Sequence, residues 1–249
     1  MVNVLVGCCG WAVKGGRRAY YGKFKTVELQ DTFYNLPKIE TVEKLRREAP
    51  SGFVFCMKAW QAITHPPTSP TWRRARTKIP KTKQKNYGNL MPTRENLEAW
   101  NKTLEVAEAL GAEVIIIQTP ASFGYTEQNF RNASEFFQQI STNKVTVGWE
   151  PRGSWRDNHD KVKNICEENN LVHVVDPFRW HPLDGCSMFY LRLHGIGRDE
   201  VNYSYKYTEE DLLLLRDKVL SLLGKKERGY VMFNNISMAV DAERLLSLL

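Results

Sequence analysis

Short apolar runs alternate with amphipathic segments along most of the chain. Most runs have the length of a β-strand, and most are followed by a segment with the three-to-four-residue apolar spacing of a helix. We predict strands over residues 2–10, 26–34, 53–58, 112–119, 145–150, 171–176, 188–194 and 230–234. We predict helices over residues 39–49, 94–110, 126–140, 158–169, 208–223 and 238–249. This alternation predicts a parallel sheet covered by helices.

Capping signals sharpen two of the helices. Thr93 is a predicted N-cap and Gly111 a predicted C′ residue for the helix between them. Thr208 and Asp211 have the Thr-x-x-Asp spacing of a capping-box variant. We therefore expect these helix boundaries to be fixed by local chemistry.

The strand count favours a closed barrel over an open sheet. A doubly wound sheet usually has about five or six strands, whereas a (β/α)8 barrel has eight and typically needs about 250 residues. Two connections, 15–23 and 179–185, resemble loops more than helices, and neither a dinucleotide fingerprint nor a P-loop follows any strand. We predict an α/β fold, a single (β/α)8 TIM-type barrel domain over residues 1–249, with an insertion at about 61–93 after the third strand.

Composition narrows the class of protein. Hydrophobic residues make up 42% of the chain and charged residues 25%, as in ordinary globular proteins. No apolar stretch approaches the roughly 20 residues of a membrane span, and the first residues enter a strand pattern without the features of a signal peptide. The five cysteines include no C-x-x-C pair, which favours buried thiols over disulfides. We expect a cytoplasmic protein with no membrane partner; its oligomeric state is not indicated.

The positive charge is concentrated in one segment. The net charge is +7, and a run without any acidic residue carries seven cations, namely Arg73, Arg74, Arg76, Lys78, Lys81, Lys83 and Lys85. Basic polar stretches of this kind commonly contact phosphates. The alternative is a solvated loop that only keeps the protein soluble. Pro66, Pro67, Pro70 and Pro80 argue against a long helix here.

Polar residues gather at the predicted strand ends, where a (β/α)8 barrel has its active site. They are Thr32, Tyr34, Lys58, Gln118, Glu150, Arg152, Asp176, Arg192, His194, Asn234 and Asn235. On the seventh strand, Leu191 and Leu193 belong against the outer helices, which directs Arg192 and His194 inward. Unpaired buried polar groups cost about 1–3 kcal/mol each, so these groups should pair with one another or with a ligand.

The alternation of the second strand also matters. Val27, Leu29 and Phe33 should share one face, and Glu28 and Thr32 the other. Glu28 lies deepest and is the polar residue that best fits a purely structural role. An internal ion-pair network, for instance of Glu150 with Arg152 or Arg192, would also explain these charges without any ligand.

These residue types suggest particular chemistry. Lys58, Arg152 and Arg192 could hold phosphate or carboxylate groups, with Thr32, Tyr34, His65, Gln118 and Asn234 as further substrate contacts. Glu150 and Asp176 could act as general acid and base, and His194 in either role. Lys58 could also form a Schiff base. A divalent metal on Glu150, Asp176 and His194 is conceivable, but no H-x-H or H-E-x-x-H spacing supports it.

Motifs along the whole chain resemble one known family. They are Gly7-x-x-Gly10-Trp11, Val27-Glu28-x-x-x-Thr32-Phe33-Tyr34-x-x-Pro37, Phe53-x-Phe55-x-x-Lys58, Thr64-His65, Gln118-x-Pro120 with Phe123, Glu150-x-Arg152-x-Ser154-Trp155, Asp176, Tyr190-x-Arg192-x-His194-Gly195 and Phe233-Asn234-Asn235. This pattern resembles the family called domain of unknown function 72, and the insertion with Trp72 and Tyr87-Gly88 resembles its archaeal branch.

The resemblance implies a TIM-type barrel similar in shape to endonuclease IV and to sugar isomerases, and through that likeness it implies nucleic-acid binding. Fold alone does not fix function. The histidine-rich metal cluster of endonuclease IV cannot be assembled from the five histidines here.

Three functional hypotheses follow. The first is a barrel that binds or processes nucleic acid, with DNA favoured, as a nuclease-like hydrolase of phosphodiester or glycosidic bonds. Trp72, Tyr87 and Trp11 could then stack on bases. The second is an enzyme acting on a phosphorylated or acidic sugar. The third is a non-catalytic scaffold whose polar strand ends are structural.

Overall fold

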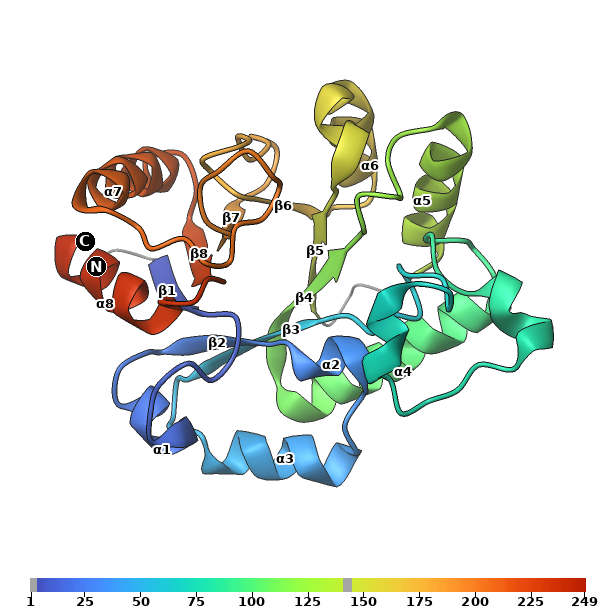
Figure 1. The fold of residues 1–249 in the computed structure, drawn as a ribbon, viewed down its shortest axis with the longest axis horizontal. Coiled ribbons are helices and arrows are strands. Elements are labelled where there is room, and N and C mark those ends of the chain that lie inside the picture. The colour runs from blue at the N-terminus through green and yellow to red at the C-terminus, as the bar shows by residue number, and fades with distance from the viewer. Residues whose placement is uncertain (1–3, 141–144) are drawn as a thin grey trace. The chain divides into compact units, whose positions relative to one another are not determined.

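The structure is a computed structural model that describes residues 4–140 and 145–249. Its parallel strands form a closed eight-stranded barrel in which the strand order follows the chain, which confirms the predicted (β/α)8 fold (Figure 1). The strands are β1 (Val4–Cys8), β2 (Thr26–Leu29), β3 (Val54–Lys58), β4 (Ala112–Gln118), β5 (Thr146–Glu150), β6 (Val172–Val175), β7 (Met188–Leu193) and β8 (Arg228–Phe233). Residues 2 and 3 of the first predicted strand lie outside the described residues.

Helices connect most of the strands. They are α1 (Gly16–Tyr21), α2 (Asp31–Tyr34), α3 (Ile39–Glu48), α4 (Arg94–Leu110), α5 (Glu127–Gln139), α6 (His159–Glu168), α7 (Glu209–Leu223) and α8 (Met238–Leu248). Short 3-10 helices are η1 (Pro70–Arg74), η2 (Lys81–Asn86) and η3 (Gly153–Asp157). In the described part of the chain, no helix has the length and apolar character needed to cross a membrane.

By their internal contacts, the residues divide into two compact units. Unit 1 comprises Met1–Leu29, Ala49–Phe55 and Val172–Leu249. Unit 2 comprises Gln30–Glu48 and Cys56–Leu171. The polar strand ends are therefore described within each unit in turn.

Buried residues on neighbouring strands pair in register in the sheet of unit 1. Val6 of β1 and Leu191 of β7 both pair in register with Val231 of β8, and all three are buried. Phe189 lies so close to Gly229 of β8 that a Cβ there would approach its ring to 1.9 Å. Only glycine fits at that position, because any side chain would displace the phenyl ring from the core.

Local capping chemistry defines the ends of α4 and α7 as predicted. The Thr93 hydroxyl accepts a hydrogen bond from the Asn96 amide, and Gly111 ends α4 with a φ of 65°. The Thr208 hydroxyl accepts from the Asp211 amide while the Asp211 side chain accepts from the Thr208 amide, which completes the capping box. These contacts satisfy amide groups that the first turn of a helix leaves unpaired.

One predicted strand and one predicted loop differ from the structure. The strand expected over 26–34 ends at Leu29, and Thr32, Phe33 and Tyr34 lie in α2. The chain turns because the Thr32 hydroxyl donates to the Lys58 carbonyl oxygen (2.7 Å) and the Phe33 amide to the Gln30 carbonyl oxygen. The 15–23 connection, expected to be a loop, contains the short helix α1.

Candidate functional site

In unit 2, polar side chains meet at the ends of β3, β4 and β5. Gln118 and Glu150 are register partners on neighbouring strands, and the Lys58 ammonium donates to Gln118 Oε1 at 3.0 Å. Lys58 Nζ also lies 4.0 Å from the centroid of the Phe33 ring. A cation over an aromatic face is stabilised by the ring quadrupole, and more strongly when it is desolvated. Lys58 is 8% exposed, so its charge is fixed in a largely buried place.

Glu150 is oriented by its neighbour Arg152. Arg152 Nε and Nη2 both donate to Glu150 Oε1, at 2.9 and 2.7 Å. The side chains are 7% and 14% exposed respectively for Glu150 and Arg152, so the contact is a largely buried ion pair. This pairing matches one of the two partners considered for Glu150 from the sequence. The charges of Glu150 and Arg152 neutralise each other in this ion pair. Lys58 therefore adds a net positive charge to the group.

His65 adds a neutral imidazole to the group. Its Nδ1 lies 2.8 Å from the Thr64 hydroxyl, and its ring packs edge-on against Phe33 with centroids 4.9 Å apart. Burial, and then the positive charges of Lys58 and Arg152, lower the pKa of His65 from 6.5 to about 3. Near neutral pH this ring therefore carries no charge, and it can donate one hydrogen bond from one nitrogen and accept one at the other.

The basic segment begins next to this group. Trp72 Nε1 donates to the His65 carbonyl oxygen at 3.0 Å. The Arg74 guanidinium lies 3.8 Å from the centroid of the Tyr34 ring. Asn35 donates to the Arg74 carbonyl oxygen and accepts from the Arg76 amide. Three side chains thus attach the start of the segment to the residues around Lys58.

The far end of the segment is also anchored. Gly88 has a φ of +83°, and a Cβ there would lie 2.4 Å from the Pro66 nitrogen. The Gly88 amide donates to the Ala62 carbonyl oxygen, and Asn96 of α4 donates to the Gly88 carbonyl oxygen. The segment between these anchors carries its cations outward: Arg73, Arg74, Arg76, Lys78, Lys81, Lys83 and Lys85 are all exposed. Within the described residues, only Lys83 of the seven forms an ion pair, at 4.0 Å from Glu95.

In unit 1, Arg192 and Glu28 form a buried pair. Arg192 Nη2 lies 2.9 Å from Glu28 Oε1 and Nε lies 3.1 Å from Oε2, and both side chains are fully buried. The Tyr190 hydroxyl donates to Glu28 Oε2 at 2.9 Å. Arg192 therefore has its carboxylate partner inside the protein, as expected of Glu28 in a structural role.

Asp176 and His194 lie together at the ends of β6 and β7. Asp176 Oδ2 accepts from the His194 amide at 3.1 Å, and Oδ1 accepts from the Phe178 amide at 3.0 Å. Arg179 lies 3.8 Å from the Asp176 carboxylate and donates to the Gly195 carbonyl oxygen at 2.8 Å. The carboxylate thus holds the backbone at both strand ends.

His194 also contacts the end of β8. Its Nδ1 lies 3.1 Å from the Asn234 side-chain nitrogen, and its ring packs edge-on against Tyr203. The neighbouring Asn235 donates to Asp241 of α8 at 2.7 Å. Asn234 is half-buried and faces the imidazole, whereas Asn235 is buried and serves the start of α8.

Two groups of the sequence-derived residues therefore come together within their own units. Unit 2 joins Thr32, Lys58, His65, Gln118, Glu150 and Arg152, with Tyr34 beneath Arg74. Unit 1 joins Asp176, His194 and Asn234, and separately Arg192 with Glu28. Phe33 and Arg179 were not predicted from the sequence as site residues. The Asp176-x-x-Arg179 spacing was a signal for the second.

Neither a metal cluster nor a reactive thiol is evident in the described residues. No three His, Cys, Asp or Glu side chains of residues 4–140 and 145–249 are placed to share a metal ion. None of the five cysteines forms a disulfide, and four of them are buried. Burial raises the pKa of the Cys8 thiol to about 12 and that of Cys9 well above its usual range. Both therefore stay protonated and poorly nucleophilic near neutral pH.

A comparison with known protein families identifies the family of this chain. The model of a family described as "Protein of unknown function DUF72" matches residues 5–249. The chain belongs to this family. No curated protein matches it.

Solved structures of DUF72 family proteins share the fold. One from Thermotoga maritima is 22% identical with a TM-score of 0.72, covering 98% of each chain. Another from Enterococcus faecalis is 19% identical with a TM-score of 0.71, covering 100% of this chain and 99% of that one. Endonuclease IV from Thermus thermophilus is a more distant likeness, at 12% identity and a TM-score of 0.55, covering 98% of this chain and all of that one. At these identities the likeness extends to the fold alone.

Proposed function

We propose that this DUF72 protein binds nucleic acid, with DNA favoured, through the basic segment of residues 73–85. The observation that carries the proposal is the attachment of that segment to the polar group of unit 2. Seven exposed cations follow Trp72, and Trp72 itself donates to the backbone of His65. A phosphate backbone bound along the segment would be led toward Lys58, Glu150 and Arg152.

The charge of the segment suits a polyanion better than a small anion. A single small ligand would engage two or three cations, whereas a nucleic-acid strand presents a phosphate to each of many. Because only Lys83 of these seven cations forms an ion pair among the described residues, binding would displace counterions and break at most that one pair. Each neutralised phosphate contributes about 0.9 units to the log–log salt slope, so binding should weaken steeply with salt.

Hydrolysis of a phosphodiester or glycosidic bond is the chemistry we propose for the strand ends. Lys58 would hold a phosphate or the negative charge that develops on a leaving oxygen. Glu150, held by Arg152, would take a proton from the attacking water, and His65 would donate or accept one hydrogen bond. In unit 1, Asp176 and His194 are further candidates for proton transfer, and Asn234 for substrate contact. The cleavage assay described below tests whether the reaction needs a divalent metal.

The test is binding of labelled single- and double-stranded DNA across a salt series. The variant changes Arg73, Arg74, Arg76 and Lys78 to Ala. The matched control removes four exposed charges elsewhere in unit 2, by changing Lys44, Arg47, Lys102 and Lys163 to Ala. We expect salt-steep binding by wild type and control and loss of at least tenfold in the variant. Salt-independent binding, or equal loss in the control, would contradict the proposal.

Cleavage is then measured with and without divalent cations, using Glu150→Gln to separate chemistry from binding. If the polar strand ends are catalytic, this variant should bind DNA normally and lose turnover. No turnover by the wild type, together with lower stability of this variant, would instead favour the scaffold hypothesis. The likeness of the insertion to the archaeal branch of the family stays a prediction from the sequence.

A second candidate is an enzyme for a phosphorylated or acidic sugar. It is favoured by the burial of Lys58, because a cation that is 8% exposed can reach a small anion in a pocket more readily than a duplex. This function predicts that ligand binding survives in the variant that lacks Arg73, Arg74, Arg76 and Lys78. DNA binding lost in the same variant supports the first candidate.

A further inference from the structure

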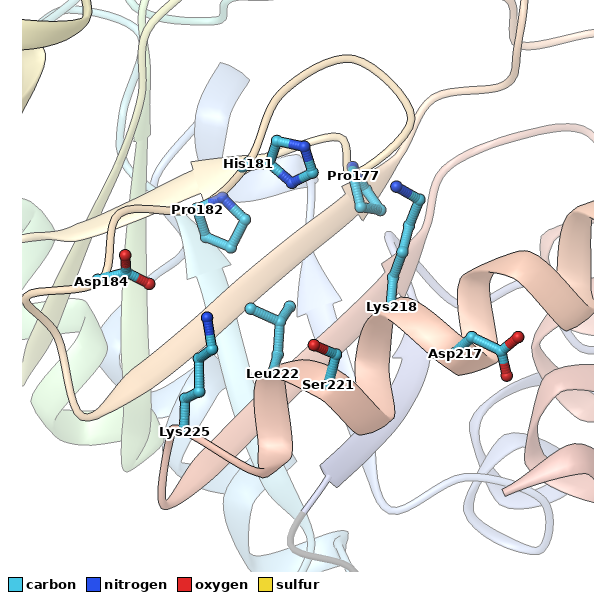
Figure 2. A pocket seen from close by; sticks show the side chains of 9 residues that line it. All are labelled: Pro177, His181, Pro182, Asp184, Asp217, Lys218, Ser221, Leu222 and Lys225. Carbon is cyan, nitrogen blue, oxygen red and sulfur yellow. The ribbon is translucent and has the colours of Figure 1, made fainter.

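A pocket of about 500 Å³ lies in unit 1, and its lining includes none of the candidate site residues (Figure 2). It is formed between the connection from β6 to β7 and the second half of α7. No helix occurs between Val175 and Met188, so this connection leaves the flank of α7 open. Its volume falls within the roughly 300–1,000 Å³ of small-molecule sites. The lining residues are Pro177, His181, Pro182, Asp184, Asp217, Lys218, Ser221, Leu222 and Lys225.

The two lysines of the pocket lining come from α7 and from the turn that follows it. Lys218, Ser221 and Leu222 are spaced by three and four residues, which places them on one face of α7, and Lys225 follows in the turn after the helix. Figure 2 shows Ser221 and Leu222 between the two lysines, with His181 across from them.

The charges of this pocket are incompletely balanced inside the protein. Neither Lys218 nor Lys225 forms an ion pair among the residues that the structure describes. The Asp217 carboxylate is already bound by Arg216, at 2.7 and 3.0 Å. Asp184 is the remaining acidic residue of the lining, against two lysines. The pocket therefore favours an anion.

The opposite wall is already held in place. Lys226 is buried, and its ammonium donates to the carbonyl oxygens of Leu183, Asp184 and Cys186 at 2.9, 3.2 and 2.8 Å. All three donors of the side chain are thereby used. The wall at residues 183–186 is thus fixed to the end of α7 without a ligand, which lowers the ordering cost of binding.

We propose that this pocket binds a small organic anion with two phosphate groups, of the size of a bisphosphorylated sugar. One phosphate lies at Lys218 and the other at Lys225, with Ser221 donating between them and the sugar against Leu222 and Pro182. Ser221 and Leu222 lie between the two lysines (Figure 2), so the pocket offers two separate cationic positions. This site is independent of nucleic-acid binding, because none of its residues belongs to the basic segment.

Titration calorimetry with fructose 1,6-bisphosphate as the probe tests the proposal, with fructose 6-phosphate, inorganic phosphate and fructose for comparison. We expect the bisphosphate to bind at least tenfold more tightly than the other three. Lys218→Ala and Lys225→Ala should each weaken it about tenfold, which corresponds to about 1.4 kcal/mol. Lys102→Ala, an exposed lysine of α4, is the matched control and should not weaken binding.

A second arm separates this site from the proposed function. The variant lacking Arg73, Arg74, Arg76 and Lys78 should bind the bisphosphate as wild type does, whether or not it binds DNA. No binding of the bisphosphate, equal affinity for inorganic phosphate, or unchanged affinity in both lysine variants would each overturn the inference. So would loss of bisphosphate binding in the basic-segment variant.

Discussion

The indole Nε1 of Trp72 donates a hydrogen bond to the carbonyl oxygen of His65 at 3.0 Å. This bond joins the first residue before the basic run to a residue of the polar group in unit 2. Because the acceptor is backbone, it holds the chain of the segment and leaves the His65 ring to its own partners. The position of the seven cations therefore depends in part on one side-chain donor.

Trp72→Phe should loosen the basic segment without unfolding the protein. The change keeps an aromatic ring but removes a hydrogen bond worth about 1 kcal/mol, or roughly a fivefold increase in local opening. Hydrogen–deuterium exchange over residues 70–90 measures the opening. The control is Trp60→Phe, because the neighbouring Trp60 indole nitrogen has no hydrogen-bond partner in the described structure. Equal exchange in both variants would show that the bond does not hold the segment.

Arg192→Leu should destabilise the fold strongly. It leaves the fully buried Glu28 carboxylate without its bidentate partner, and breaking such a pair costs about 3–5 kcal/mol. Urea denaturation measures the loss in the free energy of unfolding. Tyr190→Phe, which removes one hydrogen bond to the Glu28 carboxylate, should cost less, about 1.5–3 kcal/mol.

The double variant Glu28→Leu with Arg192→Leu refines that prediction. It removes both charges, so it should be more stable than the sum of the two single changes implies. Strict additivity would mean that the two side chains do not stabilise each other. A stable Arg192→Leu protein that has lost ligand binding would return Arg192 to a binding role.

His65 should make stability depend on pH. Its pKa is about 3 in the folded protein and near 6.5 when unfolded, so between these values the unfolded chain binds a proton that the folded chain excludes. The stabilising contribution is complete above pH 6.5 and declines as the pH falls toward 3, by about 1.4 kcal/mol per pH unit. In His65→Gln this part of the pH dependence should disappear. Urea unfolding of both proteins from pH 7.5 to 4.5 provides the comparison, and parallel curves would contradict it.

Gly195→Ala should disturb the loop after β7. Gly195 has a φ of +82°, and a Cβ there would lie 2.1 Å from the Asn202 carbonyl oxygen. Gly52→Ala is the matched control, since Gly52 has a φ of +77° with nothing within 4 Å of the added atom. We expect about 1 kcal/mol of strain in the control and at least about 2 kcal/mol more in Gly195→Ala. Equal thermal unfolding of the two variants would mean that the loop yields freely.

Features set by neighbouring residues could be predicted from the sequence. The bounds of α4 follow from Thr93 and Gly111, and the start of α7 from Thr208 and Asp211, because each cap is completed within a few residues. The closed barrel followed from the count of apolar runs. In these cases the signal and the structure it specifies occupy the same stretch of chain.

Features that depend on distant partners could not be predicted. The alternation of the second strand predicts that it continues through Phe33, on the face of Val27 and Leu29. In the structure Phe33 lies in α2 beneath the Lys58 ammonium. The partner of Arg192 is Glu28, 164 residues earlier in the chain, and periodicity carries no information about such a pairing. Residue type and strand position indicated that these groups are polar and inward, but not which of them meet.

The burial of four thiols has a practical consequence for studying the pocket beside α7. Cys8, Cys9, Cys56 and Cys166 are buried, whereas Cys186 is partly exposed and its carbonyl oxygen is held by Lys226. A maleimide fluorophore should therefore attach to the native protein at this single position. The natural sequence thus carries a labelling site two residues from Asp184 of the pocket lining, and a change in emission on ligand addition would report binding without introducing or removing any cysteine.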